Sequence, residues 1–373
     1  MLWATSSEVP VLIPAYKYQQ TLVSSTSLDE KNYLAFPILL RLGPSDVLVA
    51  FKRGGAHARD GDAVFEAVHF DPAKQRLVGS AIDFREPGLV MQDGEFARFP
   101  NGDIAGYFDV QSPAVIRQGL VQYRSTDGGR TFRNLRKVGV IDGVEYGYAF
   151  EAITSGSTTW MLVMTFRSLP GGAESVESIK DLPAHAGSVD AIRTDDNGKS
   201  WRRVRNLSRA FGNLPINESS FVRYGDGFIV TTRGYNNHEW LTLTDHEFVA
   251  KKQVDLTNKY PFVRSMIGRP RVFEKEGRFY LLGRNWTAPM TARTDGNKQM
   301  KLSLFRFDPE TLAINRHVVL DNAEEEFVRD GYYAVPYWQD RGGREFLNII
   351  TYKAVRDRFP DIVRFEFDWD EVK

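Results

Sequence analysis

The sequence predicts an all-β protein, a six-bladed β-propeller whose blades are four-stranded antiparallel sheets. First, runs rich in Val, Ile, Phe, Tyr and Thr with a period of two, joined by short Gly, Asp, Asn and Pro turns, fill nearly all of the 373 residues, and no convincing long amphipathic helix interrupts them. Second, these runs group into six pairs of hairpins of about 62 residues each, the size of one blade. Third, one polar turn pattern occurs twice. We therefore expect a single domain over residues 1–373.

The hairpins follow one another regularly along the chain. The six pairs are 36–54 with 63–82, 94–110 with 119–138, 148–168 with 188–204, 217–234 with 239–256, 269–285 with 301–319, and 331–352 with 361–372. The last pair is one strand short. We expect Val9 to Pro14 to supply this outer strand and to close the ring, because closure removes two sheet edges at once.

The repeated turn has the pattern Ser/Thr-x-Asp-x-Gly-x-Thr/Ser-Phe/Trp, found at Ser125 to Phe132 and again at Thr194 to Trp201. In such a turn the Asp carboxylate accepts local backbone N–H groups, and glycine takes the positive φ that a side chain would make unfavourable. The trailing aromatic ring then packs between sheets. Residues 69–76 and 307–312 hold substituted versions at the same place in two other blades. The turn is therefore a blade marker.

Composition excludes several classes of function. Lys plus Arg equals Asp plus Glu at 48 each, which removes any general attraction to nucleic acid or to an anionic membrane. No apolar run approaches the length of a membrane span, and no signal peptide is visible; a secreted or periplasmic location is favoured if one was removed. Six scattered His and no Cys give no metal-ligand spacing, and neither a phosphate loop nor a nucleophile elbow is present. We expect no cofactor.

Six blades with this Asp box between the third and fourth strands resemble the sialidase (neuraminidase) superfamily, and the resemblance spans most of the chain. In that family the Asp box lies on the face away from the active site. The resemblance therefore implies a glycan substrate and directs the search for chemistry to the opposite face.

On that face, the start of each innermost strand and the end of each second strand should converge near the axis. The starts are Ala35, Glu95, Glu151, Glu218, Arg269 or Arg271, and Tyr332 or Tyr333, and the ends are Arg53, Asp109, Arg167, Arg233, Arg284 and Tyr352. Polar residues are common at strand ends. So many Arg, Glu and Tyr at matched positions nevertheless indicate a functional site.

Residues 217–234 carry the strongest local resemblance, because a Glu opens the blade and an Arg ends its second strand. In sialidases this Glu is the base for a Tyr nucleophile, an exception to the usual carboxylate scheme. The resemblance assigns these roles to Glu218 and Tyr332, with Gly331 as the small preceding residue. A tyrosine needs such a partner to accept its proton, and nearby Arg stabilises the phenolate. The competing interpretation is that Tyr332 and Tyr333 simply alternate between core and solvent.

The general acid is expected in the loop within residues 50–64, which resembles the sialidase loop that carries an acidic residue. Asp60 and Asp62 both qualify, and Asp60 is preferred because Asp62 lies close to the next strand. An ordinary Gly-Asp turn would look the same. His57 is an alternative acid or base at neutral pH, although a solvated loop histidine is the more frequent situation.

Sialidases hold a substrate carboxylate with three arginines, whose bidentate geometry suits it. By its position, Arg233 resembles the second of these three arginines. The candidates for the third are Arg284 or Arg293, with Arg269 and Arg271 in competition, and Glu95 is placed with the substrate-binding residues. The first of the three arginines is missing, because Ala35-Phe36-Pro37 stands where the family has Arg-Ile-Pro. Arg53 or Arg98 would have to compensate for it.

These residues predict an exo-acting glycoside hydrolase that acts on a terminal, acidic sugar of a glycan. Ala35 weakens the case for a typical sialic-acid glycoside and favours a related acidic or neutral sugar. The second hypothesis is a polysaccharide lyase or a hydrolase of uronate-linked sugars, in which His57 or His185 transfers protons with a Tyr. The third is a glycan-binding module without activity, since aromatic and Arg side chains also make lectin clefts.

Overall fold

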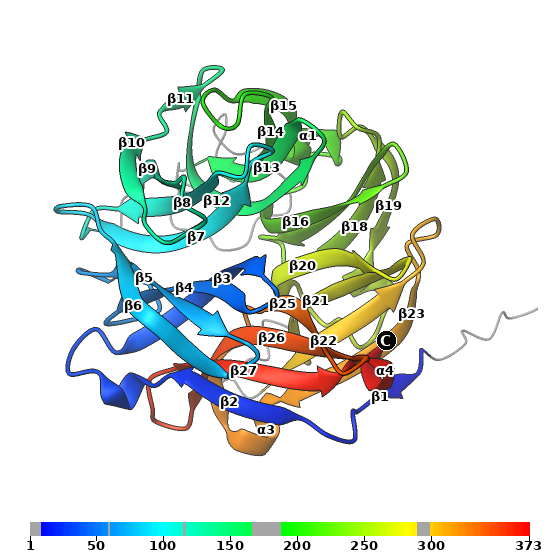
Figure 1. Ribbon diagram of the computed structural model, residues 1–373. Coiled ribbons are helices and arrows are strands. Elements are labelled where there is room, and N and C mark those ends of the chain that lie inside the picture. The colour runs from blue at the N-terminus through cyan, green and yellow to red at the C-terminus, as the bar shows by residue number, and fades with distance from the viewer. Residues whose placement is uncertain (1–8, 59, 115–116, 166–187, 289–298) are drawn as a thin grey trace, which may run out of the picture.

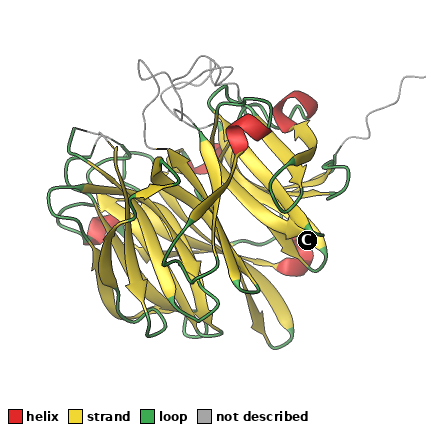
Figure 2. Cartoon of the chain, turned by 90° about the horizontal axis from the view of Figure 1, so that it is seen from above, coloured by secondary structure: helices red, strands yellow, loops and turns green. Residues whose placement is uncertain are grey.

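The computed structural model describes residues 9–58, 60–114, 117–165, 188–288 and 299–373. Six β-sheets are arranged as blades around a central axis (Figure 1). Strands make up most of the described chain, and its helices are short (Figure 2). The predicted fold class is therefore confirmed.

Each blade is built from strands that follow one another along the chain and pair antiparallel. Blade one consists of β3 (Tyr33–Gly43), β4 (Asp46–Gly54), β5 (Val64–Asp71) and β6 (Arg76–Phe84). Blade two consists of β7 (Val90–Arg98), β8 (Ile104–Gln111), β9 (Arg117–Ser125) and β10 (Arg133–Lys137). Blade three consists of β12 (Val144–Ser155), β13 (Thr158–Thr165), β14 (Val189–Thr194) and β15 (Arg202–Asn206), and the short β11 (Val140–Ile141) pairs with β12. Blade four consists of β16 (Ile216–Tyr224), β17 (Gly227–Gly234), β18 (Glu239–Thr244) and β19 (Ala250–Asp255).

Blades five and six complete the ring. Blade five consists of β20 (Ile267–Lys275), β21 (Arg278–Trp286), β22 (Met300–Phe307) and β23 (Ile314–Asn322). Blade six contains β24 (Val328–Gly331), β25 (Val335–Arg341), β26 (Arg344–Val355) and β27 (Asp361–Asp368). The short helices are η1 (Ser25–Ser27), α1 (Leu207–Ala210), α2 (Leu256–Lys259), α3 (Ala323–Glu326) and α4 (Trp369–Val372). None of the helices that the structure describes is both long and apolar enough to cross a membrane.

An N-terminal strand closes the ring, as predicted, but the predicted residues were wrong. The outer strand of blade six is β2 (Tyr18–Val23), which pairs antiparallel with β27. The segment Val9 to Pro14 instead contributes β1 (Val11–Leu12), a parallel addition to β23 of blade five. Prolines 10 and 14 bracket this segment and have no N–H for a ladder, which limits it to two paired residues.

The two turns with the repeated pattern connect third and fourth strands, β9 to β10 and β14 to β15. In the first, Asp127 Oδ1 accepts the backbone N–H groups of Arg130 and Thr131 at 3.1 and 3.0 Å. In the second, Asp196 Oδ1 accepts those of the corresponding Lys199 and Ser200, both at 3.0 Å. Each turn is thus closed by one carboxylate within its own eight residues.

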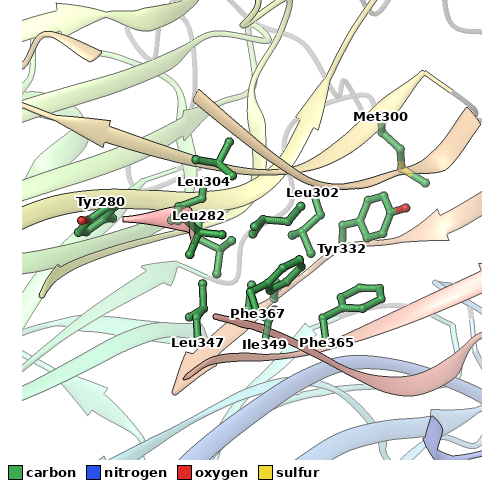
Figure 3. Packing of buried hydrophobic residues seen from close by; sticks show 14 of the residues in the cluster. Tyr280, Leu282, Met300, Leu302, Leu304, Tyr332, Leu347, Ile349, Phe365 and Phe367 are labelled. Atoms are coloured by element: carbon green, nitrogen blue, oxygen red, sulfur yellow. The ribbon is translucent and has the colours of Figure 1, made fainter. Parts of the chain in front are cut away.

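Apolar side chains of neighbouring blades pack face to face and form most of the core. The cluster between blades five and six includes Leu302, Ile349 and Phe365 (Figure 3). Burying side chains of this size contributes about 1.5 to 3 kcal/mol each. The blades are consequently rigid supports for the polar residues at their axial ends.

Candidate active site

A cavity of about 400 Å³ opens near the axis, on the face that the strand directions predict. Innermost strands, or the turns directly beside them, contribute Phe36, Asp93, Tyr148, Glu218 and Tyr333, and the ends of second strands contribute Asp109 and Arg233. Blades one, two, three, four and six therefore all supply lining residues. Of the sequence positions that were expected to converge, Glu218, Tyr333, Asp109 and Arg233 line this cavity.

The centre of the cavity wall is a hydrogen-bonded group of Glu218, Tyr333 and Arg233. The Tyr333 hydroxyl donates to Glu218 Oε1 at 2.7 Å. Arg233 Nη1 lies 2.6 Å from Glu218 Oε2 and donates to the Tyr333 oxygen at 3.1 Å. The backbone N–H of Arg269 donates to Glu218 Oε2 at 2.7 Å. Both oxygens of a nearly buried carboxylate are thus satisfied by groups from three blades.

This arrangement fixes the charge of each member of the group. Burial raises the pKa of Glu218, but the Arg233 charge and the hydrogen bonds from Tyr333 and Arg233 outweigh it and lower this pKa to about 2. Burial and the Glu218 charge raise the pKa of Tyr333 above its ordinary value. At neutral pH, a protonated phenol therefore faces an ionised carboxylate, which is the starting state for proton transfer from Tyr333 to Glu218.

Arg284 places a second guanidinium group close to the Tyr333 hydroxyl. Its Nη2 lies 3.3 Å from that oxygen, and its Cζ lies 4.6 Å from the centre of the Tyr333 ring. Its Nη1 donates to Asp330 Oδ1 and to the Gly331 carbonyl, each at 3.3 Å. Two cations beside one phenol oxygen favour any negative charge that develops on it.

Asp330, next to this group, holds His57 at the cavity. His57 Nδ1 lies 2.7 Å from Asp330 Oδ2, and the Tyr352 hydroxyl donates to Asp330 Oδ1 at 3.0 Å. The Tyr33 hydroxyl also donates to Asp330 Oδ2. Burial raises the pKa of Asp330, but His57, Arg284 and Tyr33 together hold it well below its usual range. Asp330 is therefore ionised.

The prediction that Tyr332 faces the site was wrong. Its side chain is fully buried among Leu302, Ile349 and Phe365 between blades five and six (Figure 3). Its hydroxyl donates to Asp321 Oδ2 at 2.6 Å. The backbone φ of Tyr332 is +70°, which is not extended, so the local turn of the backbone decides which of the two adjacent tyrosines reaches the cavity. Tyr333 is the one that does.

Asp60 does not line the cavity, and its geometry does not fit the predicted general acid. Its carboxylate accepts the backbone N–H groups of Gly55, Ala56 and Asp62 at 2.8, 3.2 and 3.2 Å, and it lies 3.3 Å from the buried Lys52 Nζ. Burial raises the pKa of Asp60, but Lys52 and these amides lower it overall. Asp60 therefore shapes its own loop. The alternative, Asp62, is exposed and pairs with Lys31 at 2.8 Å.

Neither of the two arginines expected to compensate for the missing first member of the triad reaches the cavity. Arg53 donates to Glu66 at 2.9 Å, and Arg98 donates to the Arg41 carbonyl at 2.9 Å; neither lines the cavity. Ala35 is fully buried. Phe36 presents its ring to the cavity instead, 4.9 Å from the His57 ring and 5.5 Å from the Tyr333 ring.

Glu95 and Arg269, predicted to bind substrate, belong to a buried ion-pair network and do not line the cavity. Arg271 donates to Glu95 and to Glu151, each at 2.6 Å. Arg269 Nη2 lies 3.4 Å from Glu95 and 3.8 Å from Asp93. These charges join the innermost strands of blades two, three and five across the axis. Arg167, His185 and Arg293, the remaining sequence candidates, lie outside the described residues.

Sequence reasoning missed Arg117, which begins the third strand of blade two and lines the cavity. Its Cζ lies 5.2 Å from the centre of the Tyr148 ring, and its Nη1 lies 3.7 Å from Asp109 Oδ2. Burial raises the pKa of Asp109 to about 6, although Arg117 opposes the shift. Asp93 accepts the Tyr148 hydroxyl. A search of third-strand starts as well as second-strand ends would have included Arg117.

Within the described part of the chain, no group of three or more His, Cys, Asp or Glu side chains is arranged to hold a metal ion. The cavity lining includes a phenol beside a carboxylate, an imidazole and guanidinium groups, which can transfer protons and bind anions.

The comparisons with known proteins concern the fold. No protein-family model matches the sequence, and no curated protein matches it. Among solved structures, a Dyadobacter fermentans protein of unknown function has a TM-score of 0.68 at 13% identity, covering 94% of this chain and 97% of that one.

Two glycoside-acting proteins have similar structures. The NanB sialidase of Streptococcus pneumoniae has a TM-score of 0.64 at 10% identity, with 95% of this chain and 71% of that one covered. The α-L-arabinanase of Penicillium chrysogenum has a TM-score of 0.63 at 12% identity, with 95% and 99% covered. At these identities the likeness shows a shared propeller fold.

Proposed function

We propose that this protein is an exo-acting glycoside hydrolase with a sialidase-like site, which removes a terminal, acidic sugar from a glycan. One observation carries the proposal: the Tyr333 hydroxyl donates to the ionised Glu218 at 2.7 Å within the axial cavity, and Arg233 contacts both residues. A buried phenol paired with a carboxylate base is the arrangement that a tyrosine nucleophile requires.

In the proposed reaction, the Tyr333 oxygen attacks the anomeric carbon while its proton passes to Glu218, and the bond to the leaving oxygen breaks as that oxygen takes a proton from a general acid of the site. Arg233 and Arg284 favour the developing phenolate. Water then attacks the same carbon and gives a proton back to that acid, the bond to Tyr333 breaks, and Glu218 returns its proton to the phenol oxygen. Two displacements leave the anomeric configuration retained.

The substrate class is argued from the size and charge of the cavity. A volume of about 400 Å³ is near the lower end of ligand pockets and suits one terminal sugar better than a chain passing through. Arg117 lines it, and 23% of the Arg117 side chain is exposed. We assign this guanidinium to the substrate's acidic group, because it presents donors that a carboxylate would satisfy.

Aryl glycosides test the proposal directly. The purified protein is incubated with aryl sialosides, aryl uronides and neutral aryl glycosides, and the released phenol is measured. We expect turnover of an acidic substrate, with kcat/KM reduced by at least about 10²-fold in Tyr333→Phe and in Glu218→Gln.

Tyr332→Phe is the matched control, because it removes the neighbouring hydroxyl outside the cavity. It should keep the wild-type kcat/KM. Full activity in Tyr333→Phe would exclude the tyrosine mechanism.

A polysaccharide lyase is the second candidate, favoured by the presence of His57 and Tyr333 in the same cavity as Arg117. Elimination from a uronate-containing polysaccharide would produce an unsaturated uronate, whose ultraviolet absorbance grows with time. Hydrolysis gives no such signal. Sugar binding without any product after long incubation would instead favour the glycan-binding hypothesis.

A further inference from the structure

We infer that His57, held by Asp330, is the general acid and base of this site, the group that protonates the leaving oxygen and later activates water. This inference rests on the proposed glycoside hydrolase function and deepens it. It replaces Asp60 by another residue of the same loop.

The conformation of the loop decides which of its residues reaches a substrate. The Asp60 carboxylate is occupied by three backbone N–H groups and lies beside Lys52. Lys52 Nζ in turn donates to the carbonyl oxygens of Ala56 and His57 at 2.8 and 3.1 Å. This internal bonding fixes the loop backbone and leaves the His57 side chain at the cavity, with 44% of it exposed.

The contact with Asp330 orients the imidazole ring. Nδ1 is engaged by the carboxylate at 2.7 Å, so that Nε2 is the nitrogen left for a partner in the cavity. Lys52 approaches His57 only through the His57 carbonyl, and Tyr33, Tyr352 and Arg284 face Asp330. The contact therefore fixes which ring nitrogen can meet a leaving oxygen.

The other acidic groups of the cavity are less accessible. Asp93 is 4% exposed and accepts the Tyr148 hydroxyl and the Gly94 N–H. Asp109 is 1% exposed and accepts the Gln111 amide at 3.1 Å. A leaving oxygen has to come within hydrogen-bond distance of its acid, and among these three groups the His57 side chain is by far the most exposed.

The proton transfers balance over the two displacements. As Tyr333 attacks the anomeric carbon, the bond to the leaving oxygen breaks, and that oxygen takes the proton from His57 Nε2. His57 is then neutral. In the second displacement it takes a proton from the attacking water as the bond from the sugar to Tyr333 breaks, which restores the imidazolium.

Leaving-group dependence tests the role of His57. We compare kcat/KM of wild type, His57→Ala, His57→Gln and Asp109→Asn on two acidic-sugar glycosides, one with a dinitrophenol leaving group and one with an alkyl alcohol. Dinitrophenolate departs without protonation, whereas an alkoxide does not. Both His57 variants should lose about 10²- to 10⁴-fold on the alkyl glycoside and less than about 10-fold on the dinitrophenyl glycoside.

His69→Ala is the matched control, because His69 Nδ1 also contacts a carboxylate, Asp46, at 2.9 Å but does not line the cavity. It should behave as wild type on both substrates. Asp330→Asn gives a second readout: an amide can accept from or donate to Nδ1 and no longer fixes the orientation and tautomer of the ring, so kcat/KM should fall on the alkyl glycoside and change little on the dinitrophenyl glycoside. A merely structural role would lower kcat/KM on both glycosides alike.

The outcomes separate this inference from the function on which it rests. The assignment of His57 would be overturned if folded His57 variants lost kcat/KM equally on both glycosides, or if Asp109→Asn showed the selective loss on the alkyl glycoside instead. In either case, turnover by the wild type would still support the glycoside hydrolase function. If the wild type cleaves neither glycoside, the proposed function fails and the role of His57 fails with it. Circular dichroism establishes that each variant is folded.

Discussion

Two kinds of carboxylate in this molecule have lowered pKa values for different structural reasons. Asp196 is bound by backbone and hydroxyl groups of its own eight-residue turn, which lower its pKa to about 2 against a burial effect that raises it. Burial also raises the pKa of Glu218, but this pKa reaches a similar value through the charge of Arg233, the hydrogen bonds from Tyr333 and Arg233 and the charge of Arg269, residues that come from three blades. The turn is a local structure, whereas the site exists only when the propeller is assembled.

The largest expected effect comes from breaking the buried network that joins the blades beneath the cavity. Arg271→Met leaves Glu95 and Glu151 without the cation that contacts both at 2.6 Å. Removing one member of a buried ion pair is expected to lower the free energy of unfolding by about 3 to 5 kcal/mol. Urea denaturation measures this. The exposed pair Arg329–Asp357 provides the control, and Arg329→Met should cost less than about 1 kcal/mol.

Arg233→Gln should weaken activity and change its pH dependence. A hydrogen bond to a charged group contributes about 1.5 to 3 kcal/mol, so kcat/KM should fall roughly 10- to 100-fold. Without the Arg233 charge, the pKa of Glu218 should rise from about 2 toward its ordinary value of 4.5. Because the reaction needs ionised Glu218, the acidic limb of the kcat/KM profile should move to higher pH. An unchanged acidic limb would contradict this role of Glu218.

The same contrast explains how far the sequence could predict this protein. Strand periodicity, blade count and the Asp turns depend on residues close together in the chain, and these features were correct. Glu218 and Arg233 were predicted to lie at the cavity because matched strand ends of a propeller must converge, and both line it. Tyr332 was wrongly preferred to Tyr333 because the choice depends on the local backbone, including a φ of +70° at Tyr332 that periodicity does not predict.

The loop of blade one shows a second kind of limit. Sequence places Asp60 and His57 in the same polar segment, and either residue type can act as an acid. Their positions are decided by the internal hydrogen bonds of Asp60 and by the contact of His57 with Asp330, 273 residues away. Such a long-range contact leaves no local sequence signal. Arg117 was missed because its strand position was not included in the search.

The turns should tolerate substitution better than the site does. Asp127→Ala removes an acceptor of two backbone N–H groups and of the Thr131 hydroxyl, all within one turn. Since these donors can turn to water, we expect a loss of about 1 kcal/mol in the free energy of unfolding. Urea denaturation should detect this loss, while kcat/KM stays at the wild-type value. A large loss of activity would mean that the two regions are coupled.

The smallest expected effect is the pH dependence of stability that Asp196 contributes. The pKa of Asp196 is lowered from 3.8 to about 2 on folding, so its carboxylate stabilises the folded state above pH 3.8. This stabilisation is lost as the pH falls from about 4 to about 2, because the unfolded chain takes up the proton first. Solvent screening at this turn keeps the contribution below about 1 kcal/mol. Asp196→Ala should therefore be less stable than wild type at pH 6, and the difference should shrink at pH 2, as measured by urea denaturation at both pH values. A difference that stays constant between pH 6 and pH 2 would show that the turn is held by its backbone conformation and not by the charge of Asp196.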